Sequence, residues 1–300
     1  MVEQPLVSVI IPSYGRPVQL AACLRSVAAS EFPPGPFDVL VVDDGNADRL
    51  ERTLQPSPGP AEINWVRLPE NRGPAEARNA GARAARGRFL AFIDDDCLAD
   101  PSWLARLFAA SVANSGAAVG GRVVDGSDGN LYCAADQAIL DVVYAHYNAD
   151  PLHARFFSTA NLAVPADAFR ETGGFDPAYR TSEDREFCAR WLAAGRRLVY
   201  AADAVAVHAA ASSLGRFWRR HYAFGRGAYR FRSRHARSAG DRITLESSEF
   251  YRRLVFSPMT RPAASKGAAI AALIVVSQIA SALGFLAARR ADHTSKGRTA

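Results

Sequence analysis

Short apolar runs alternate with amphipathic stretches over the first 113 residues of the chain. The apolar runs cover residues 6–11, 37–42, 63–68 and 88–93, and turn residues or acids follow each of them. Short runs rich in Val and Ile indicate strands that are buried on both faces. The stretches between them place apolar residues at helical spacing. This alternation predicts an α/β fold with a mostly parallel central sheet and helices on both faces.

Local signals set the expected ends of the helices. Pro74 stands at the first position of a helix expected to end before Gly87. Asp100 with Pro101 is expected to cap the helix that carries Trp103. Farther along, a helix is expected over 182–194 and a strand over 198–208. Thr181 and Asp184 have the spacing of a capping box for that helix.

The chain changes character near residue 211. An Arg-rich and aromatic stretch begins there, and residues 267–288 form a run of 22 residues without a charge. We therefore expect an α/β domain over 1–210, a basic aromatic helical extension over 211–265, an apolar helix over 266–290 and a tail over 291–300.

Composition narrows the class of protein. Apolar residues make up 49% and charged residues 22% of the chain, which excludes a disordered chain, a coiled coil and a collagen-like fibre. The net charge of +6 has a local origin, because residues 216–237 contain eight Arg and no acid. Such a run points to one basic face. The four cysteines are scattered, so we expect no disulfide scaffold or zinc site and a reducing compartment. The N-terminus shows no basic leader or cleavage site, so we expect no signal peptide.

Polar residues stand where the predicted strands end. They are Ser13 and Tyr14, then Asp43 and Asp44, then the run 94–96. Ligands of open α/β sheets bind outside the carboxyl ends of the strands, so these side chains are expected on one rim. Asp94 and Asp96, two apart on an extended segment, are expected to face one side. Two such carboxylates could bind a Mg²⁺ or Mn²⁺ ion that also binds a diphosphate. Acids that are merely solvated in a loop would give the same sequence pattern.

Other candidates for chemistry each have a structural alternative. Arg72 and Arg78 flank and enter a helix beside the rim, where they could bind phosphate or simply be solvated. Asp184 or Glu183 could act as a general base, or Asp184 could only cap its helix. His208 could ligate a metal or be structural. The GxGxxG and GxxxxGK[ST] motifs are absent from the sequence, which argues against a nicotinamide-binding Rossmann domain and a P-loop ATPase.

Seven segments in order resemble the family 2 glycosyltransferases, which have the A-type glycosyltransferase fold. They are Val9-Ile10-Ile11-Pro12-Ser13-Tyr14, Val42-Asp43-Asp44-Gly45, Asn71-Arg72-Gly73-Pro74, Ala77-Arg78-Asn79-Ala80-Gly81, Asp94-Asp95-Asp96, Gly173-Gly174-Phe175-Asp176 and Glu183-Asp184. The resemblance covers about residues 5 to 210. It implies inverting transfer of a sugar from a nucleotide-diphosphate donor.

The resemblance also assigns residues to roles. It implies donor binding by the strand-end segments and the helix arginine, namely Pro12, Ser13, Tyr14, Asp43, Asp44, Arg78, Asp94 and Asp95. It implies that Asp94 and Asp96 hold Mn²⁺ or Mg²⁺, with His208 as a further ligand. Asp184 is implied as the base, with Glu183 in reserve. Gly15 and Asn46 depart from the usual residues, and the missing Q-x-x-R-W signature implies a single transfer per encounter.

The end of the chain suggests a membrane. Aromatics interleaved with Arg suit anionic headgroups or a lipid-phosphate acceptor, while nucleic acid and a solvated helix face are the alternatives. Because the stretch precedes an apolar segment, we expect a membrane surface as partner and no nucleic acid. The 22-residue run would span about 33 Å, close to the roughly 30 Å hydrocarbon core. Spanning, lying in the interface and packing on the domain all stay open. We expect the cytoplasmic face of the cell membrane, and a lipid-linked or cell-envelope glycan as acceptor.

Two other functions fit the same residues. A degenerate family member could bind a nucleotide sugar or a lipid without turnover. A retaining transferase could share the fold, and the anomeric configuration of the product would distinguish it.

Overall fold

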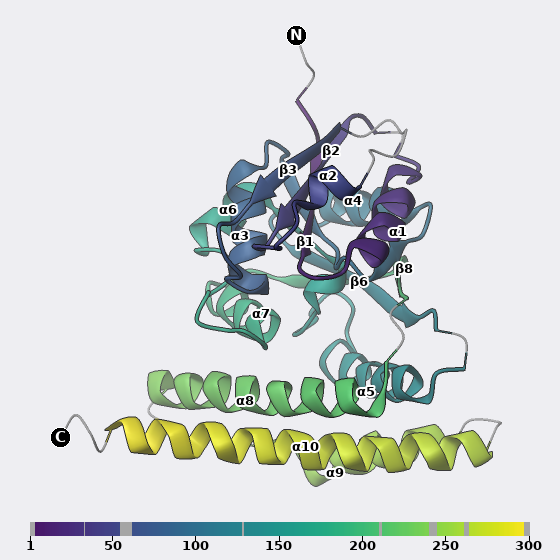
Figure 1. The fold of residues 1–300 in the computed structure, drawn as a ribbon, viewed down its shortest axis with the longest axis vertical. Coiled ribbons are helices and arrows are strands. Elements are labelled where there is room, and N and C mark those ends of the chain that lie inside the picture. Colours follow the sequence, from purple (N-terminus) through teal and green to yellow (C-terminus); the bar gives the residue numbers. More distant parts are fainter. Residues whose placement is uncertain are drawn as a thin grey trace. The chain divides into compact units, whose positions relative to one another are not determined.

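The structure is a computed structural model that describes residues 4–32, 34–54, 62–127, 129–209, 212–239, 245–260 and 264–296. The chain forms two compact units (Figure 1). The first contains Met1–Gly126 and Tyr147–Ala210, and the second contains Ser127–His146 and Ala211–Ala300. The segment around residues 127–146 therefore leaves the first unit and joins the C-terminal one.

An eight-stranded mixed sheet forms the centre of the first unit. Its order is β3-β2-β1-β4-β7-β6-β8-β5. The strands are β1 (Val7–Ser13), β2 (Phe37–Asp43), β3 (Glu62–Arg67), β4 (Phe89–Phe92), β5 (Cys97–Ala99), β6 (Ala118–Asp125), β7 (Leu162–Pro165) and β8 (Leu198–His208). The pairings among β1 to β4 and between β6 and β8 are parallel, and β7 and β5 are antiparallel to their neighbours. This confirms the predicted α/β fold.

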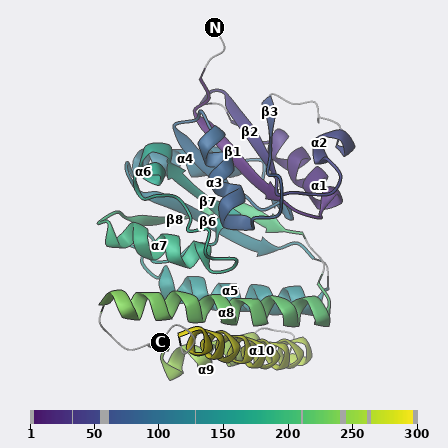
Figure 2. The ribbon, with the colours of Figure 1, turned by 60° about the vertical axis from the view of Figure 1, so that its left-hand side comes forward.

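The parallel half brings the strand ends together. Ser13 at the end of β1 is paired with Asp43 at the end of β2, and Ile10 with Phe92 at the end of β4. The helices of this unit are α1 (Pro17–Ala28), α2 (Leu50–Thr53), α3 (Pro74–Ala84), α4 (Trp103–Ala113), α6 (Ala166–Glu171) and α7 (Glu183–Ala193), with a 3₁₀ turn η1 (Thr159–Asn161). Helices α1 and α3 lie on opposite sides of the sheet, as right-handed crossovers require (Figures 1 and 2).

The second unit is helical. It contains α5 (Leu131–Tyr147), α8 (Leu214–Ala239), α9 (Ser248–Phe256), a 3₁₀ turn η2 (Ser257–Thr260) and α10 (Ala264–Lys296). The basic stretch lies on α8, and the uncharged run lies within the longer α10. Helix α10 is the one helix of the described residues that is long and apolar enough to cross a membrane, over Lys266–Thr294.

Two predicted caps are wrong. Helix α7 begins at Glu183, and its N-cap residue is Ser182 in the left-handed region at φ 68°, so the N-terminus lies one residue beyond the Thr181–Asp184 capping box. The carboxylate of Asp100 does not cap α4. It accepts hydrogen bonds from the amide and hydroxyl of Ser102, because Pro101 and Ser102 form a turn before the helix.

Candidate active site

The acids after β4 form a tight turn. Cys97 N donates to Asp94 O over 3.0 Å, so residues 94–97 reverse the chain between β4 and β5. The expectation that Asp94 and Asp96 sit on an extended segment and face one side is therefore wrong. The carboxylate of Asp94 is paired with one arginine, Arg78, whereas those of Asp95 and Asp96 are paired with another, Arg16.

Arg78 joins the first of these acids to the start of α7. Its guanidinium donates to Asp94 Oδ1 over 2.6 Å and to Glu183 Oε1 over 2.9 Å. The Arg78 side chain is only 4% exposed. The buried guanidinium has two carboxylate partners, and removing Arg78 would leave the buried Glu183 without its cation.

Asp95 and Asp96 share a second arginine. Ser13 Oγ donates to Asp95 Oδ2 over 2.7 Å, and Arg16 lies 3.2 Å from Asp95 Oδ1. Arg16 also donates to Asp96 Oδ2. Burial raises the pKa of Asp95 to about 7, although Arg16 and Ser13 both act to lower it. The Arg16 side chain is 46% exposed, so it covers these acids from the solvent side.

His208 stands beside the same turn. It is paired with Cys97 across β8 and β5, and its Nε2 lies 3.6 Å from Asp96 Oδ2. Two ligands each at about 2.0–2.2 Å from one divalent ion are about 3–3.6 Å apart, so this oxygen and nitrogen have a suitable separation. Asp94 turns away to Arg78, and no group of three or more His, Cys, Asp and Glu among the described residues has a geometry that could hold a metal. The metal assignment stays a prediction.

Asp184 follows Glu183 in the first turn of α7. It is half-buried, and its Oδ1 accepts a hydrogen bond from the Arg185 amide. Burial, with the negative charge of Glu183, raises the pKa of Asp184 to about 7. A carboxyl group with a pKa near neutrality can exchange a proton at physiological pH, which general-base chemistry needs.

The acids after β2 organise a loop. Asp43 accepts from Asn46 and from Arg67, the latter over 2.7 Å. Asp44 accepts from the amides of Arg72 and Gly73 over 2.8 and 2.9 Å. Burial raises the pKa of Asp44, opposed by those two amides. Both acids therefore hold the rim of the sheet together within the chain itself.

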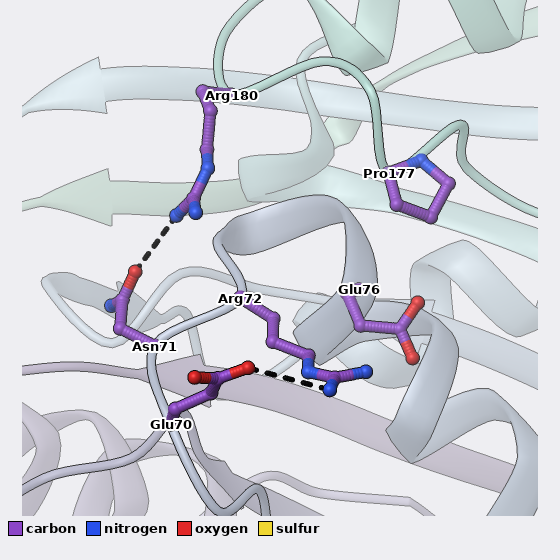
Figure 3. Close-up of a pocket in the computed structure, with 6 residues that line it drawn as sticks. All are labelled: Glu70, Asn71, Arg72, Glu76, Pro177 and Arg180. Atoms are coloured by element: carbon purple, nitrogen blue, oxygen red, sulfur yellow. Dashed lines mark hydrogen bonds and ion pairs between the residues drawn. The ribbon is translucent and has the colours of Figure 1, made fainter.

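The loop after β3, whose amides bind Asp44, borders a surface hollow of about 480 Å³, shown in Figure 3. Arg72 and Arg180 reach into it, paired with Glu70 and Asn71, the latter pair at 2.8 Å. The hollow is lined by Glu70, Asn71, Arg72, Glu76, Pro177 and Arg180. No acid of the turn at 94–97 is among these lining residues.

The predicted donor residues on β1 differ in exposure. Ser13 is buried and bonded to Asp95, whereas Tyr14 is 53% exposed and Pro12 is half-buried. Ser13, Asp94 to Asp96, Arg78, Glu183 and His208 are joined by the contacts described above. Asp43, Asp44 and Tyr14 belong to the neighbouring part of the rim.

Sequence reasoning missed the arginines that balance these acids. Arg16 pairs with Asp95 and Asp96, and Arg67 pairs with Asp43. The pairing of Arg16 could have been predicted from its place in the sequence. It is a cation in the loop after the first strand, on the same rim as three acids. Arg67 ends β3 next to the end of β2, as the parallel register Asp43 to Arg67 now makes plain.

Comparison with known proteins identifies similar sequences. The profile described as glycosyl transferase family 2 matches residues 8–173, more than half of the chain. Glycosyltransferase AglE of Haloferax volcanii is 29% identical over 225 residues, which are 74% of this chain and 73% of that protein. A pre-mycofactocin glycosyltransferase of Mycobacterium tuberculosis is 30% identical over 57% of this chain, which spans 37% of the length of that relative.

Solved structures share the fold. A mannosyltransferase of Pyrobaculum calidifontis, in complex with GDP-Man and Mn²⁺, matches with a TM-score of 0.63 at 19% identity, over 99% of this chain and 81% of that one. Residues 1–349 of TarS from S. aureus, in complex with UDP-GlcNAc, match with a TM-score of 0.56 at 15% identity, over 96% and 92% of the two chains.

Proposed function

The chain belongs to glycosyl transferase family 2 and is a glycosyltransferase, and on that premise we propose that it moves a sugar from a nucleotide-diphosphate donor to an acceptor hydroxyl with inversion. The observation that carries the proposal is the double contact of Arg78, which puts Asp94 and Glu183 on one guanidinium. One candidate donor acid, Asp94, and the residue next to the candidate base are thus bound by the same side chain.

We assign the general base to Asp184. Its neighbour Glu183 is committed to Arg78, while Asp184 has a pKa near 7. The Asp184 carboxylate accepts the proton of the acceptor hydroxyl as that oxygen bonds to the anomeric carbon. The bond from that carbon to the diphosphate breaks, and the nucleoside diphosphate leaves with the electron pair. A positioned base contributes about 10²- to 10⁴-fold to such a step.

The donor is assigned to the rim. Pro12, Ser13, Tyr14, Asp43 and Asp44 would hold the nucleoside, with Arg78, Asp94 and Asp95 toward the diphosphate. The two fold neighbours bind GDP-Man and UDP-GlcNAc according to their descriptions, which supports a nucleotide sugar as the class of donor.

Asp96 and His208 are the residues that would hold a divalent ion, and Asp94 would join them by giving up its contact with Arg78. Hard oxygen and imidazole ligands suit Mn²⁺ or Mg²⁺. Such an ion supplies electrostatic stabilisation of the negative charge on the leaving diphosphate. Asp96 must exchange its Arg16 contact for the ion, since Arg16 bonds the same oxygen that lies near His208.

We place the enzyme at the cytoplasmic face of the cell membrane, with a lipid-linked or cell-envelope glycan as acceptor. The support is the arginine-rich sequence of α8 and the apolar helix α10. Nucleotide sugars are cytosolic, so the catalytic unit would face the cytosol.

The test is a panel of UDP- and GDP-sugars with Mn²⁺, first by thermal shift and then with lipid-phosphate and glycan acceptors. Transfer with an inverted anomer supports the proposal. Retention of configuration points to the retaining alternative, and donor binding without hydrolysis or transfer points to a binding protein. Asp184→Asn should bind donor and not transfer, whereas Asp167→Asn, at an exposed position on α6, should behave as wild type.

A further inference from the structure

Among the described residues of the second unit, helices α5, α8, α9 and α10 all contribute to a hydrophobic core. Ala135 and Ala138 of α5, Phe217 of α8, Phe250 and Leu254 of α9 and Ile274 of α10 form that core. Within this unit α10 and α9 lie in one layer and α8 and α5 in the next (Figures 1 and 2). Helix α10 is therefore one wall of a helical bundle.

Helices α8 and α10 are in backbone contact. A Cβ on Gly225 would lie 1.9 Å from Ser281 O, and one on Gly284 would lie 2.0 Å from Tyr222 O. Ser281 Oγ donates to the backbone oxygen of His221 over 3.1 Å. Tyr229 OH donates to Asp292 Oδ2 farther along the same pair of helices. Small residues thus hold α8 directly beside the apolar part of α10.

The partners of α10 carry charges that a lipid interior would not accept. Helix α8 contains eight arginines. Inside the bundle, Asp136 of α5 accepts from Arg220 over 2.7 Å and lies 2.9 Å from His221. If α10 crossed a bilayer with this packing, these groups would enter the hydrocarbon, where charged side chains are strongly disfavoured.

The face of α10 that points away from α8 is apolar and exposed. Val275, Ile279, Leu283 and Leu286 are 43–50% exposed, and their spacing of four, four and three residues puts them on one side of the helix. We call these four residues the outer stripe. The opposite side buries Ser277 and Ala280 completely. Phe256 and Met259, from α9 and η2 in the same layer, are also about half exposed.

Deepening the membrane association proposed above, we propose that α10 lies flat on an anionic lipid surface with its outer stripe in the boundary between headgroups and acyl chains. Helix α8 then stays on the aqueous side of α10. Exposed Lys266 and Arg289 stand at the two ends of the apolar segment, where they can reach lipid phosphates. An antiparallel second copy on the same stripe would instead bring Lys266 close to the partner's arginine end, which is repulsive.

Topology distinguishes flat binding from crossing. The four native cysteines are buried, so a single added cysteine labels over a low background. His293→Cys near the end of α10 and Val112→Cys on α4 both stand at exposed positions. A membrane-impermeant maleimide is applied to spheroplasts and to inverted vesicles of a bacterial host. Flat binding predicts that both sites label from the same side, whereas labelling from opposite sides overturns the proposal.

The outer stripe is tested by flotation of the full chain with vesicles containing phosphatidylglycerol. Leu283→Gln with Leu286→Gln should reduce flotation at least tenfold, while Leu152→Gln, 52% exposed in the first unit, should have no effect. Undiminished flotation of the double variant overturns the proposal. The proposal is also overturned if the wild-type protein is a dimer and the substitutions dissociate it without changing lipid binding. Transferase activity is not needed for either experiment, so a failure here is separate from a failure of the proposed function.

Discussion

Arg78 donates a hydrogen bond to Glu183 across 2.9 Å, although the two residues are 105 positions apart in the sequence. The contact fixes the start of α7 against α3 and engages one of the two adjacent acids. Asp184, the other acid, has a bond from the amide of Arg185 in its own helix. The pair is thereby divided into one carboxylate that holds the site together and one that is placed to accept a proton.

Exchanging each acid for its amide should separate these two roles. Asp184→Asn should lower transfer by about 10²- to 10⁴-fold and leave donor affinity unchanged, because the base is lost and the ion pair with Arg78 is kept. Glu183→Gln should lower both transfer and the melting temperature, because it weakens a buried ion pair. The measurements are kcat, donor affinity by calorimetry and thermal unfolding. If Asp184→Asn transfers at the wild-type rate, another group is the base.

The pH profile should report the raised pKa of Asp184. A base must be deprotonated to act, so kcat/KM should fall about tenfold per pH unit below pH 7, where the carboxyl is protonated. Part of the shift comes from the negative charge of Glu183. Residual transfer by Glu183→Gln should therefore have its acidic limb at lower pH. A limb at the same pH in that variant would mean that Glu183 does not influence the base.

The same shift has a consequence for stability. The folded protein binds the Asp184 proton more tightly than the unfolded chain, whose carboxyl has an ordinary pKa near 3.8. The free energy of unfolding should thus decrease as the pH rises from about 4 through 7. Asp184→Asn removes this penalty, so it should stabilise the protein more at pH 8 than at pH 5. Urea titrations of the metal-free protein at the two pH values measure this difference.

Arg16 should compete with a divalent ion for Asp96. Its guanidinium is paired with Asp95 and Asp96, and the side chain is nearly half exposed, so it can move away without disrupting the core. Arg16→Gln should bind Mn²⁺ several-fold more tightly in the absence of donor, as measured by electron paramagnetic resonance. Arg25→Gln, at an exposed position on helix α1, which follows Arg16, is the control. Weaker Mn²⁺ binding by Arg16→Gln would show that Arg16 supports the metal site instead.

Two glycines of α8 should respond in opposite directions. Gly225→Ala puts a methyl group 1.9 Å from Ser281 O, so it should destabilise the second unit by about 1–3 kcal/mol or more. At Gly215 an added Cβ meets only the end of the Arg219 side chain, at 3.7 Å. Gly215→Ala should therefore be neutral or stabilise by up to about 1 kcal/mol through helix propensity. Thermal unfolding followed by circular dichroism measures both effects.

The strands and the rim could be predicted because they depend on local pattern. Strand β8 has the predicted bounds, since a long apolar run between Gly195 and the basic stretch has few alternatives. Polar residues at the carboxyl ends of parallel strands must share an edge of the sheet, and Ser13 and Asp43 do. Family segments in the right order then identified the class of enzyme.

The partners of each acid could not be predicted. Whether Asp94 faces Asp96 depends on the turn that Cys97 closes, and the same residues can be extended or turned. Arg16 and Arg78 are separated from the acids that they pair with by 16 to 105 positions in the sequence. Such pairs are set by packing of the whole unit, so a single sequence contains no periodic signal for them.

Residues 127–146 lie within the sequence of the first unit but belong to the second unit, which makes the folding of the two units interdependent during synthesis. Helix α5 emerges early, yet the helices that complete its core are translated only after residue 211. Until then Ala135 and Ala138 have no Phe217 or Ile274 to cover them. A chain truncated after residue 210 should therefore expose the apolar face of α5 and be prone to aggregation. A soluble catalytic fragment will require residues 127–146 to be replaced by a short polar loop.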